Sequence, residues 1–405
     1  MTVAALESLP FGLERLALAA AVAGHRLALL TSDRTVYRHE LAAMPEEILD
    51  IVDVDTTDPG AVRRALAGLP DLVGLVNTTD TWSVPAADLA AELGLPGPDP
   101  ADVRVLRDKA LVRQRLHAAG LSRIVASTHP AAVELPAVLK DSAGTSSRGV
   151  WIVHDEAELR AALTEAAACG GELKGRLFAE PFLPGPLYSA ETLSWKGETR
   201  LLGVSSRQMS RTSAVREEGA AFPVGLPPGG HETLARWAAD VLATAGHDQG
   251  FAHVEFVETS HGPELVEINR RIGGGLVGEA LCRALGTDVY DAVIEVAIGL
   301  RPTLMDGPLV APFTGPAVAF VLVYPDRPGT LTGWRGLDGL GAFPGNVEWF
   351  PVRAPGDVVH AVGDQRACTG LVLAEAETAE LAQHRAWSAA ASVRPLMGPL
   401  PTGVC

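Results

Sequence analysis

The first hundred residues alternate between two hydrophobic patterns. In some stretches apolar residues recur every three to four positions, as in amphipathic helices, and between them lie short unbroken apolar runs typical of buried strands. The predicted helices are 13–23, 59–69 and 84–93, and the predicted strands are 26–31, 50–55 and 72–77. Because strands that alternate with helices usually pair in parallel, residues 1–100 predict a small α/β domain.

The pattern changes after a stretch rich in glycine and proline at 94–100. A helix is predicted next, then a small unit rich in strands that ends at residue 190. Its elements are a helix at 102–119, strands at 137–140 and 150–153, a helix at 156–168 and a strand at 177–182. These elements make residues 101–190 a second unit.

The remaining chain predicts two more units. Residues 191–300 contain a hairpin and a helix from about Leu276. Residues 301–405 show short strands between glycine and proline turns, a final helix near 375–392 and a loose tail from Pro395.

The hairpin, at 251–258 and 263–271, is the most informative segment. Strict alternation gives each strand one polar face and one apolar face. The polar faces carry His253, Glu255, Glu267, Asn269 and Arg271. On the second strand, Val266 and Ile268 are expected on the opposite, apolar face.

A turn at 259–262 would place Glu255 directly across from Glu267. Two carboxylates about 5 Å apart repel each other unless a cation lies between them. Glutamate and asparagine oxygens suit Mg²⁺, which proteins commonly hold with one or two carboxylates and substrate phosphates. We therefore expect Glu255, Glu267 and Asn269 to bind Mg²⁺, and Arg271 to stabilise a transferring phosphoryl group. A solvated strand face is the alternative.

A loop rich in glycine, serine and threonine joins Lys140 to Gly149. Backbone N–H groups in such a loop can surround phosphate oxygens, and Lys140 is placed to meet their charge. The loop is not a Walker A motif, because no Gly-Lys-Ser/Thr closes it. A flexible hairpin turn with a solvated lysine is the other interpretation.

Three further residues carry weak signals when taken singly. Lys109 lies on an amphipathic helix, where a lysine is usually solvated. Glu180 ends an apolar strand before a proline-rich linker, whose backbone could pair with an adenine edge or form an ordinary loop. His253 is an isolated histidine on a strand, and a structural role is the simpler interpretation.

Composition restricts the partners and the compartment. The net charge of −16 and the pI near 5.1 argue against nucleic acid or an anionic membrane as the main partner. The 4 cysteines lie far apart without a CxxC pair, which favours reduced thiols in the cytoplasm. The N-terminus does not read as a secretory signal, and the most apolar stretch is too short to span a bilayer.

Taken in chain order, these segments resemble the ATP-grasp superfamily. Asp108-Lys109 with Arg113 resembles the helix that enters the ATP-grasp fold. Leu139-Lys140…Gly144-Thr-Ser-Ser-Arg-Gly149 resembles the family's second lysine and phosphate-covering loop. Ala179-Glu180-Pro-Phe-Leu-Pro-Gly185…Glu191 resembles the hinge that grips adenine, and the hairpin resembles the magnesium motif.

Within the superfamily, the chain resembles L-amino acid ligases and related carboxylate–amine ligases. The features are the histidine before Glu255, the glycine run after Arg271, and the segment from Gly203 to Pro223 that in such ligases borders the substrate pocket. The resemblance implies an α/β (α+β) ATP-grasp fold. An N-terminal Rossmann-like pre-ATP-grasp domain would precede it, and a C-terminal lid-like, β-rich subdomain similar to that of biotin carboxylase would follow.

The resemblance also implies roles for individual residues. The implied catalytic residues are Arg271 and His253, and the implied metal ligands are Glu255, Glu267 and Asn269. The implied nucleotide contacts are Lys109, Lys140, Ser146, Ser147, Gly149, Glu180, Phe182, Leu183 and Glu191. The implied substrate contacts are Arg207, Glu217, Gly273 and Gly274.

The implied activity is that of an ATP-dependent carboxylate–amine ligase. It would form an amide (peptide) bond through an acylphosphate, joining an amino acid to a carboxylic or amino acid in natural-product biosynthesis, such as that of an antibiotic or siderophore. The cofactors would be ATP and two Mg²⁺ ions. The partners would be small-molecule carboxylates and amines, and the candidate assembly is a homodimer. The alternatives are an ATP-grasp carboxylase or C–N ligase of primary metabolism, of the purine or biotin type, and a non-catalytic nucleotide-binding protein.

Overall fold

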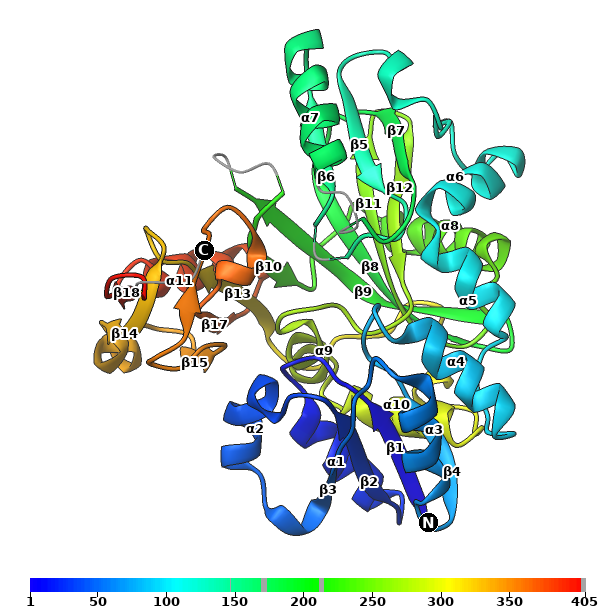
Figure 1. Cartoon of the computed structure of the whole chain (residues 1–405), viewed down its shortest axis with the longest axis vertical. Helices are drawn as coiled ribbons and strands as arrows, with labels where there is room; N and C mark the ends of the chain where they lie inside the picture. Colours follow the sequence, from blue (N-terminus) through cyan, green and yellow to red (C-terminus); the bar gives the residue numbers. More distant parts are fainter. Residues whose placement is uncertain (146, 169–172, 211–214, 402–405) are drawn as a thin grey trace.

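The computed structural model describes residues 1–145, 147–168, 173–210 and 215–401. Figure 1 shows the N-terminal elements at the bottom, a small sheet covered by α7 at the top, and the C-terminal elements at the left. A long sheet joins these regions through the middle of the molecule. None of the helices in the described ranges combines the length and the apolar character needed to cross a membrane.

The N-terminal region is a parallel sheet of order β3-β2-β1-β4 with helices around it. Its strands are β1 Thr2–Leu6, β2 Arg26–Thr31, β3 Leu49–Asp53 and β4 Leu72–Val76. Its helices are α1 Leu13–Val22, α2 Arg38–Ala43, α3 Pro59–Ala67 and α4 Ser83–Glu92. The predicted parallel sheet is confirmed. The fully buried strand β1 was not predicted, because five small or apolar residues at the start of a chain show no alternation.

The predicted helix at 102–119 is wrong in one respect, because it is two helices. They are α5 Pro100–Arg107 and α6 Lys109–Ala118. Asp108 separates them with an extended backbone, and its side chain accepts hydrogen bonds from the backbone N–H groups of Ala110 and Leu111. This N-cap begins α6 in a new direction and places Lys109 at its first position.

The small sheet is antiparallel, with order β6-β5-β7. Its strands are β5 Ala137–Asp141, β6 Val150–Val153 and β7 Leu177–Pro181, and α7 Glu156–Ala168 packs on β6. The loop predicted to cover phosphates joins β5 to β6. The small sheet that carries this loop lies at the top of Figure 1.

The long sheet has eight strands, paired antiparallel, in the order β12-β11-β8-β9-β10-β13-β17-β15. In chain order they are β8 Leu187–Trp195, β9 Glu198–Met209, β10 Glu217–Phe222, β11 Gly250–Thr259, β12 Gly262–Asn269, β13 Ala317–Val323, β15 Glu348–Pro351 and β17 Gly370–Ala376. The helices that follow or cover these strands are α8 Gly230–Ala245, α9 Val277–Leu285, α10 Val289–Ala297 and α11 Ala379–Ala390. Because β10 pairs with β13, one sheet runs from the hairpin into the C-terminal region.

The C-terminal region differs from the prediction at two places. The final helix begins at Ala379 rather than near residue 375, because residues 375–376 belong to β17. The expected loose tail contains β18 Arg394–Met397, which pairs with β14 Gly329–Arg335, while β16 Val358–Val359 pairs on its other side.

Candidate active site

A cavity of about 750 Å³ lies where the small sheet, the long sheet and the N-terminal region meet. Most of the residues expected at the site line it. They are Lys109, Lys140, Ser147, Glu180, Phe182, Leu183, Arg207, Glu217, His253, Glu255, Glu267, Asn269, Arg271 and Gly274. Residues 109 and 271 are 162 positions apart in the chain, so only the fold brings this set together.

Three of the contacts expected in the described part of the chain are not among the residues that line the cavity. Ser146 lies outside the described residues. Gly149 turns away at the end of the loop with a φ of +66°, where a Cβ would lie 2.9 Å from the Cβ of Asp141. A Cβ on Gly273 would lie 2.7 Å from His253 Nδ1, so this glycine allows close packing on the histidine rather than a substrate contact.

Glu191 is the third, and its expected contact with the nucleotide is not what the structure shows. It is 2% exposed and lies behind His253, on the neighbouring strand β8. Its oxygens lie 2.9 Å from His253 Nδ1, and Ser189 and Ser205 donate hydrogen bonds to it. Glu191 thus orients His253 from the neighbouring strand. It is buried because the register of β8 pairs it with His253.

The hairpin has the predicted register. His253 pairs with Asn269, Glu255 with Glu267, and Thr259 with Gly262 at the turn. A bulge follows, because Phe256 pairs with Leu265 rather than with Val266. The prediction that Val266 lies on the other face of the strand from Glu267 is therefore wrong.

The bulge changes which side chains face the cavity. Val266 lines the cavity beside Glu267. Leu265 and Ile268 instead pack in a core cluster with Val254, Phe256 and residues of α8. Strict alternation cannot satisfy both groups, and an extra residue on β12 allows the core positions and the cavity positions to be filled together.

Each of the two opposed carboxylates meets a cationic side chain. Lys109 Nζ lies 3.1 Å from Glu267 Oε1, and Arg207 Nη1 lies 2.9 Å from Glu255 Oε1. Burial alone would raise the pKa of Glu255, but Arg207 and His253 outweigh it and hold that pKa well below its usual range. The carboxylate of Glu255 is thus kept ionised and available to bind a cation.

The donors at this point fit Mg²⁺. Among the described residues, no group of three or more histidine, cysteine, aspartate or glutamate side chains could hold a metal alone. Glu255, Glu267 and Asn269 provide two carboxylates and an amide, which matches an ion that completes its coordination with phosphates and water. A closed protein cage, as in a structural zinc site, is not the arrangement here.

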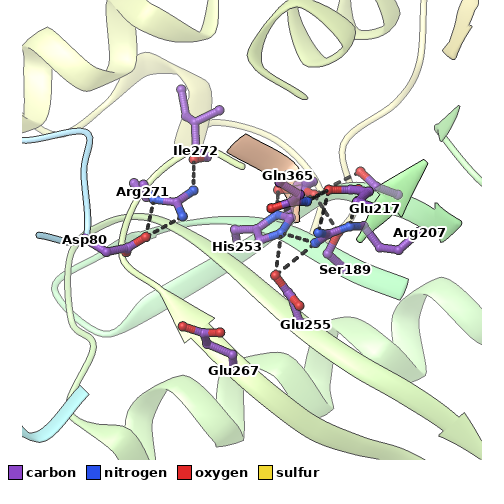
Figure 2. Close-up of polar contacts among 12 residues, drawn as sticks. Asp80, Ser189, Arg207, Glu217, His253, Glu255, Glu267, Arg271, Ile272 and Gln365 are labelled. Carbon is purple, nitrogen blue, oxygen red and sulfur yellow. Dashed lines mark hydrogen bonds and ion pairs between the residues drawn. The ribbon is translucent and has the colours of Figure 1, made fainter. Parts of the chain in front are cut away.

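Arg271 is held by an aspartate from the N-terminal region, as Figure 2 shows. Its Nε and Nη2 donate to Asp80 Oδ2 at 2.9 and 2.5 Å, and its Nη1 donates to the Ile272 carbonyl at 3.0 Å. With its amide nitrogen turned towards them, Asn269 also donates to Asp80 Oδ1 at 3.3 Å and to Glu267 Oε1 at 3.1 Å. Asp80 therefore joins the arginine to the metal-ligand residues.

Sequence reasoning missed Asp80. It lies four residues after β4, in a polar segment that begins at Asn77. The carboxyl ends of parallel strands are where α/β sheets usually carry ligand-binding side chains, so this position was a signal that could have found it.

A second network surrounds Arg207 (Figure 2). Its Nε and Nη2 donate to the two oxygens of Glu217 at 2.6 and 2.9 Å, and Gln365 donates to the same carboxylate at 2.9 Å. Arg207 Nη1 lies 2.9 Å from His253 Nε2. Burial lowers the pKa of His253, but Glu191 outweighs it and raises that pKa to about 9. The network joins β9, β10, β11 and the C-terminal region at one point of the cavity.

Lys140 is positioned by a buried ion triad. Glu180 pairs with Lys140 through one oxygen and, at 3.1 Å, with Arg113 Nε through the other. Arg113 also donates to the Leu265 carbonyl, and its side chain is 2% exposed. Burial would raise the pKa of Glu180, but the two cations outweigh it and lower that pKa. The carboxylate of Glu180 is therefore committed to Lys140 and Arg113, which leaves the backbone of the linker for an adenine edge.

Two family models match the chain. The model described as ATP-grasp domain matches residues 133–279, and the model described as L-amino acid ligase C-terminal domain 2 matches residues 321–397. The first range contains the small sheet, the hairpin and the start of α9. The second contains β14 to β18, including the short 3₁₀ helix Gln365–Ala367 between β16 and β17.

Relatives in sequence include ligases. An uncharacterised protein of Sinorhizobium fredii is 27% identical, over 86% of this chain and 73% of its own. Human carnosine synthase 1 is 27% identical over 58% of this chain, and dapdiamide A synthase of Enterobacter agglomerans is 27% identical over 40%. The chain spans 32% of the length of that carnosine synthase and 40% of that dapdiamide synthase.

Solved structures show the same fold. The L-amino acid ligase from Bacillus licheniformis matches with a TM-score of 0.82 and 18% identity, over 98% of each chain. A biotin carboxylase domain from Hydrogenobacter thermophilus, solved with MgADP and bicarbonate, matches with a TM-score of 0.76 and 17% identity, over 98% of this chain and 90% of its own. The chain therefore contains an ATP-grasp domain and, after it, a region that matches the second C-terminal domain of L-amino acid ligases, and its fold is that of the Bacillus licheniformis L-amino acid ligase.

Proposed function

We propose that the protein joins a carboxylic acid to an amine through an acylphosphate, with cleavage of ATP to ADP and orthophosphate. One observation carries the proposal. A single cavity brings together two opposed carboxylates, the amide of Asn269, the cations Lys109 and Lys140, and an arginine held by Asp80. These groups suit a phosphoryl transfer whose charge must be neutralised away from bulk water.

The nucleotide would lie between the small sheet and the hairpin. Apolar residues of β5, β6 and the linker after β7, namely Val138, Ile152, Phe182 and Leu183, line that part of the cavity and suit an adenine ring. Lys140, held by Glu180, and Lys109 would meet the phosphates. Ser147 and Gly144 of the loop line the cavity beside them.

Glu255, Glu267 and Asn269 would hold two Mg²⁺ ions. The metal would neutralise charge on the phosphates. Lys109 and Arg207 lie against the two glutamates, so both cations would be close to phosphates and substrate bound beside the metal.

Arg271 would bind the carboxylate substrate. Its planar guanidinium can hold a carboxylate, or an acylphosphate, through paired hydrogen bonds. Asp80 fixes its Nε and Nη2 side, so the orientation of the guanidinium is set before substrate arrives. His253, held at Nδ1 by Glu191 and lying 2.9 Å at Nε2 from Arg207 Nη1, would lie close to the same point.

The relatives guide the choice of substrates. Their printed names include L-amino acid ligase, carnosine synthase and dapdiamide A synthase. We therefore propose that at least one substrate is an amino acid and that the product is a dipeptide or a similar amide. A role in natural-product biosynthesis, in the cytoplasm, belongs to the same proposal.

An ADP-release screen of amino acids in pairs tests the function. ADP and orthophosphate should appear by phosphorus NMR, with an amide product by mass spectrometry. Glu267→Gln, which removes a charged metal ligand, is the inactive control. Pyrophosphate would show adenylation and refute the acylphosphate route, whereas ADP release that requires bicarbonate would favour a carboxylase. No ADP release with any pair would favour a nucleotide-binding protein without catalysis.

A further inference from the structure

Part of the cavity wall is apolar and does not belong to the nucleotide region. We call six of its residues the apolar patch: Phe11, Val277, Phe320, Leu322, Val352 and Leu371. They come from the segment after β1, the start of α9 and the C-terminal half of the long sheet. None of them lies on the small sheet or the hairpin, where the nucleotide and the metal would bind.

The patch is one continuous surface. Val277, Phe320 and Leu371 are buried members of a single hydrophobic cluster, and Phe11, Leu322 and Val352 pack against that cluster while remaining half-exposed. Gly275 brings the backbone onto it, because a Cβ there would lie 3.1 Å from the ring of Phe320 and 3.6 Å from Leu371. The half-exposed residues therefore line the cavity and are supported from behind by the buried hydrophobic cluster.

The patch adjoins the groups that would react. Gly274 and Gly275, which line the cavity, follow Arg271 by three and four residues and lead directly to Val277. The charged residues that line the same cavity nearby, Arg207 and Glu217, are paired with each other. A ligand on the patch would thus keep a carboxylate near Arg271 while its own side chain contacts only carbon.

We propose that the amino acid substrate carries an apolar side chain, aliphatic or aromatic, which binds on the apolar patch. The proposal rests on the proposed function and names the substrate class of that site. Burying such a side chain removes its surface, and that of Phe11, Leu322 and Val352, from water. A polar or charged side chain would lose its hydration there and find no hydrogen-bonding side chain in the patch.

A size-matched substrate series tests the proposal. ADP release is measured with leucine and asparagine, methionine and glutamine, and phenylalanine and lysine, each with the same second substrate. The apolar member of each pair should have a kcat/KM about 10- to 100-fold higher, the range expected when a buried site has no partner for a polar group. Equal values, or a preference for the polar members with amide still formed, would overturn the inference and leave the proposed function standing.

Variants of the patch localise the effect. Leu322→Asn should raise the KM for leucine about tenfold or more while the KM for ATP stays within about twofold. Leu322→Ala, a milder change, should shift the preference towards larger side chains. Leu381→Asn is the control, because this residue lies on α11, outside the cavity, and is 40% exposed. An unchanged substrate series in both Leu322 variants would overturn the inference.

A binding measurement keeps the inference separate from catalysis. If no pair of amino acids supports ADP release, the proposed function fails. Calorimetry with leucine and with asparagine, in the presence of Mg²⁺ and a non-hydrolysable ATP analogue, then decides the question. Leucine should bind at least tenfold more tightly than asparagine, and equal or absent binding of both would overturn the inference.

Discussion

Asp80→Asn should impair amide formation much more than it impairs ATP binding. The change keeps the shape of the side chain but removes the charge that holds Arg271 through two hydrogen bonds of 2.9 and 2.5 Å. Both side chains are largely buried, at 12% and 14% exposure, so solvent screens the pair little. Hydrogen bonds to charged groups contribute about 1.5–3 kcal/mol, and we expect a loss of about 2 kcal/mol.

That loss corresponds to a fall of about 30-fold in kcat/KM for the carboxylate substrate. The KM for ATP should change far less, because Lys140 and Lys109 keep their own partners, Glu180 and Glu267. The assay is coupled ADP release, with each substrate varied in turn at saturation of the others.

A matched control lies in the same region. Asp88→Asn makes the same change in an ion pair with Arg104 whose partners are 44% and 52% exposed, and such surface pairs contribute about 0–1 kcal/mol. A double-mutant cycle with Arg271→Lys measures the coupling itself. If the two losses add within about 0.5 kcal/mol, or if Asp80→Asn is as silent as Asp88→Asn, then Asp80 does not act through Arg271.

Three further predictions follow from the site and its surroundings. Glu267→Gln should keep the fold but lower turnover at least about a hundredfold, because an amide loses charge-assisted binding of Mg²⁺, and raising the Mg²⁺ concentration should restore part of the rate; wild-type ADP production would remove the hairpin from the mechanism. Lys140→Ala should weaken ATP more than AMP in calorimetry, since its charge would face phosphates, and equal weakening would place its effect on folding or on the adenosine end. Burial and, as the second cause, the charge of Arg270 lower the pKa of His247 to about 3, so the neutral ring stabilises the fold above pH 6.5 and this stability is lost as the pH falls from about 6.5 towards 3. Urea unfolding of wild type and His247→Gln across that range should show a flatter pH dependence of stability in the variant, and parallel curves would contradict the assignment.

The contact between Arg270 and His247 limits the choice of control variants for Arg271. Alternation along the chain would place Arg270 on the other face of the strand from Arg271, as an inert counterpart. It instead donates from Nε to His247 Nδ1 at 3.0 Å and from Nη2 to the Gln249 carbonyl at 3.1 Å. Arg270→Lys would disturb this buried contact, so it is unsuitable as a silent control.

The sequence predicted many of the elements and the hairpin register because these depend on neighbours in the chain. Parity along two strands and a four-residue turn are enough to pair Glu255 with Glu267. The bulge at Val266 could not be predicted, because it arises from the fit of Leu265 and Ile268 against α8. Local pattern does not contain that packing.

The missed partners are distant in sequence. Asp80 and Arg271 are 191 positions apart, and Glu191 and His253 are 62 positions apart. A motif marks an acidic residue but does not tell whether it faces a ligand or supports another side chain, as Glu191 supports His253. That distinction follows from strand order, since β8 lies beside β11 and away from the sheet edge.

The pairing of β10 with β13 has a consequence for dissecting or recombining this protein. Residues Gly219 to Phe222 pair with Val321 to Val318, and a Cβ on Gly219 would lie 2.7 Å from the Phe320 carbonyl, so the two strands meet closely. A fragment that stops before β13 would expose the N–H and C=O groups of β10 as an open edge, which invites aggregation. Chimeras that exchange substrate preference between related enzymes should therefore keep β10 and β13 from the same parent.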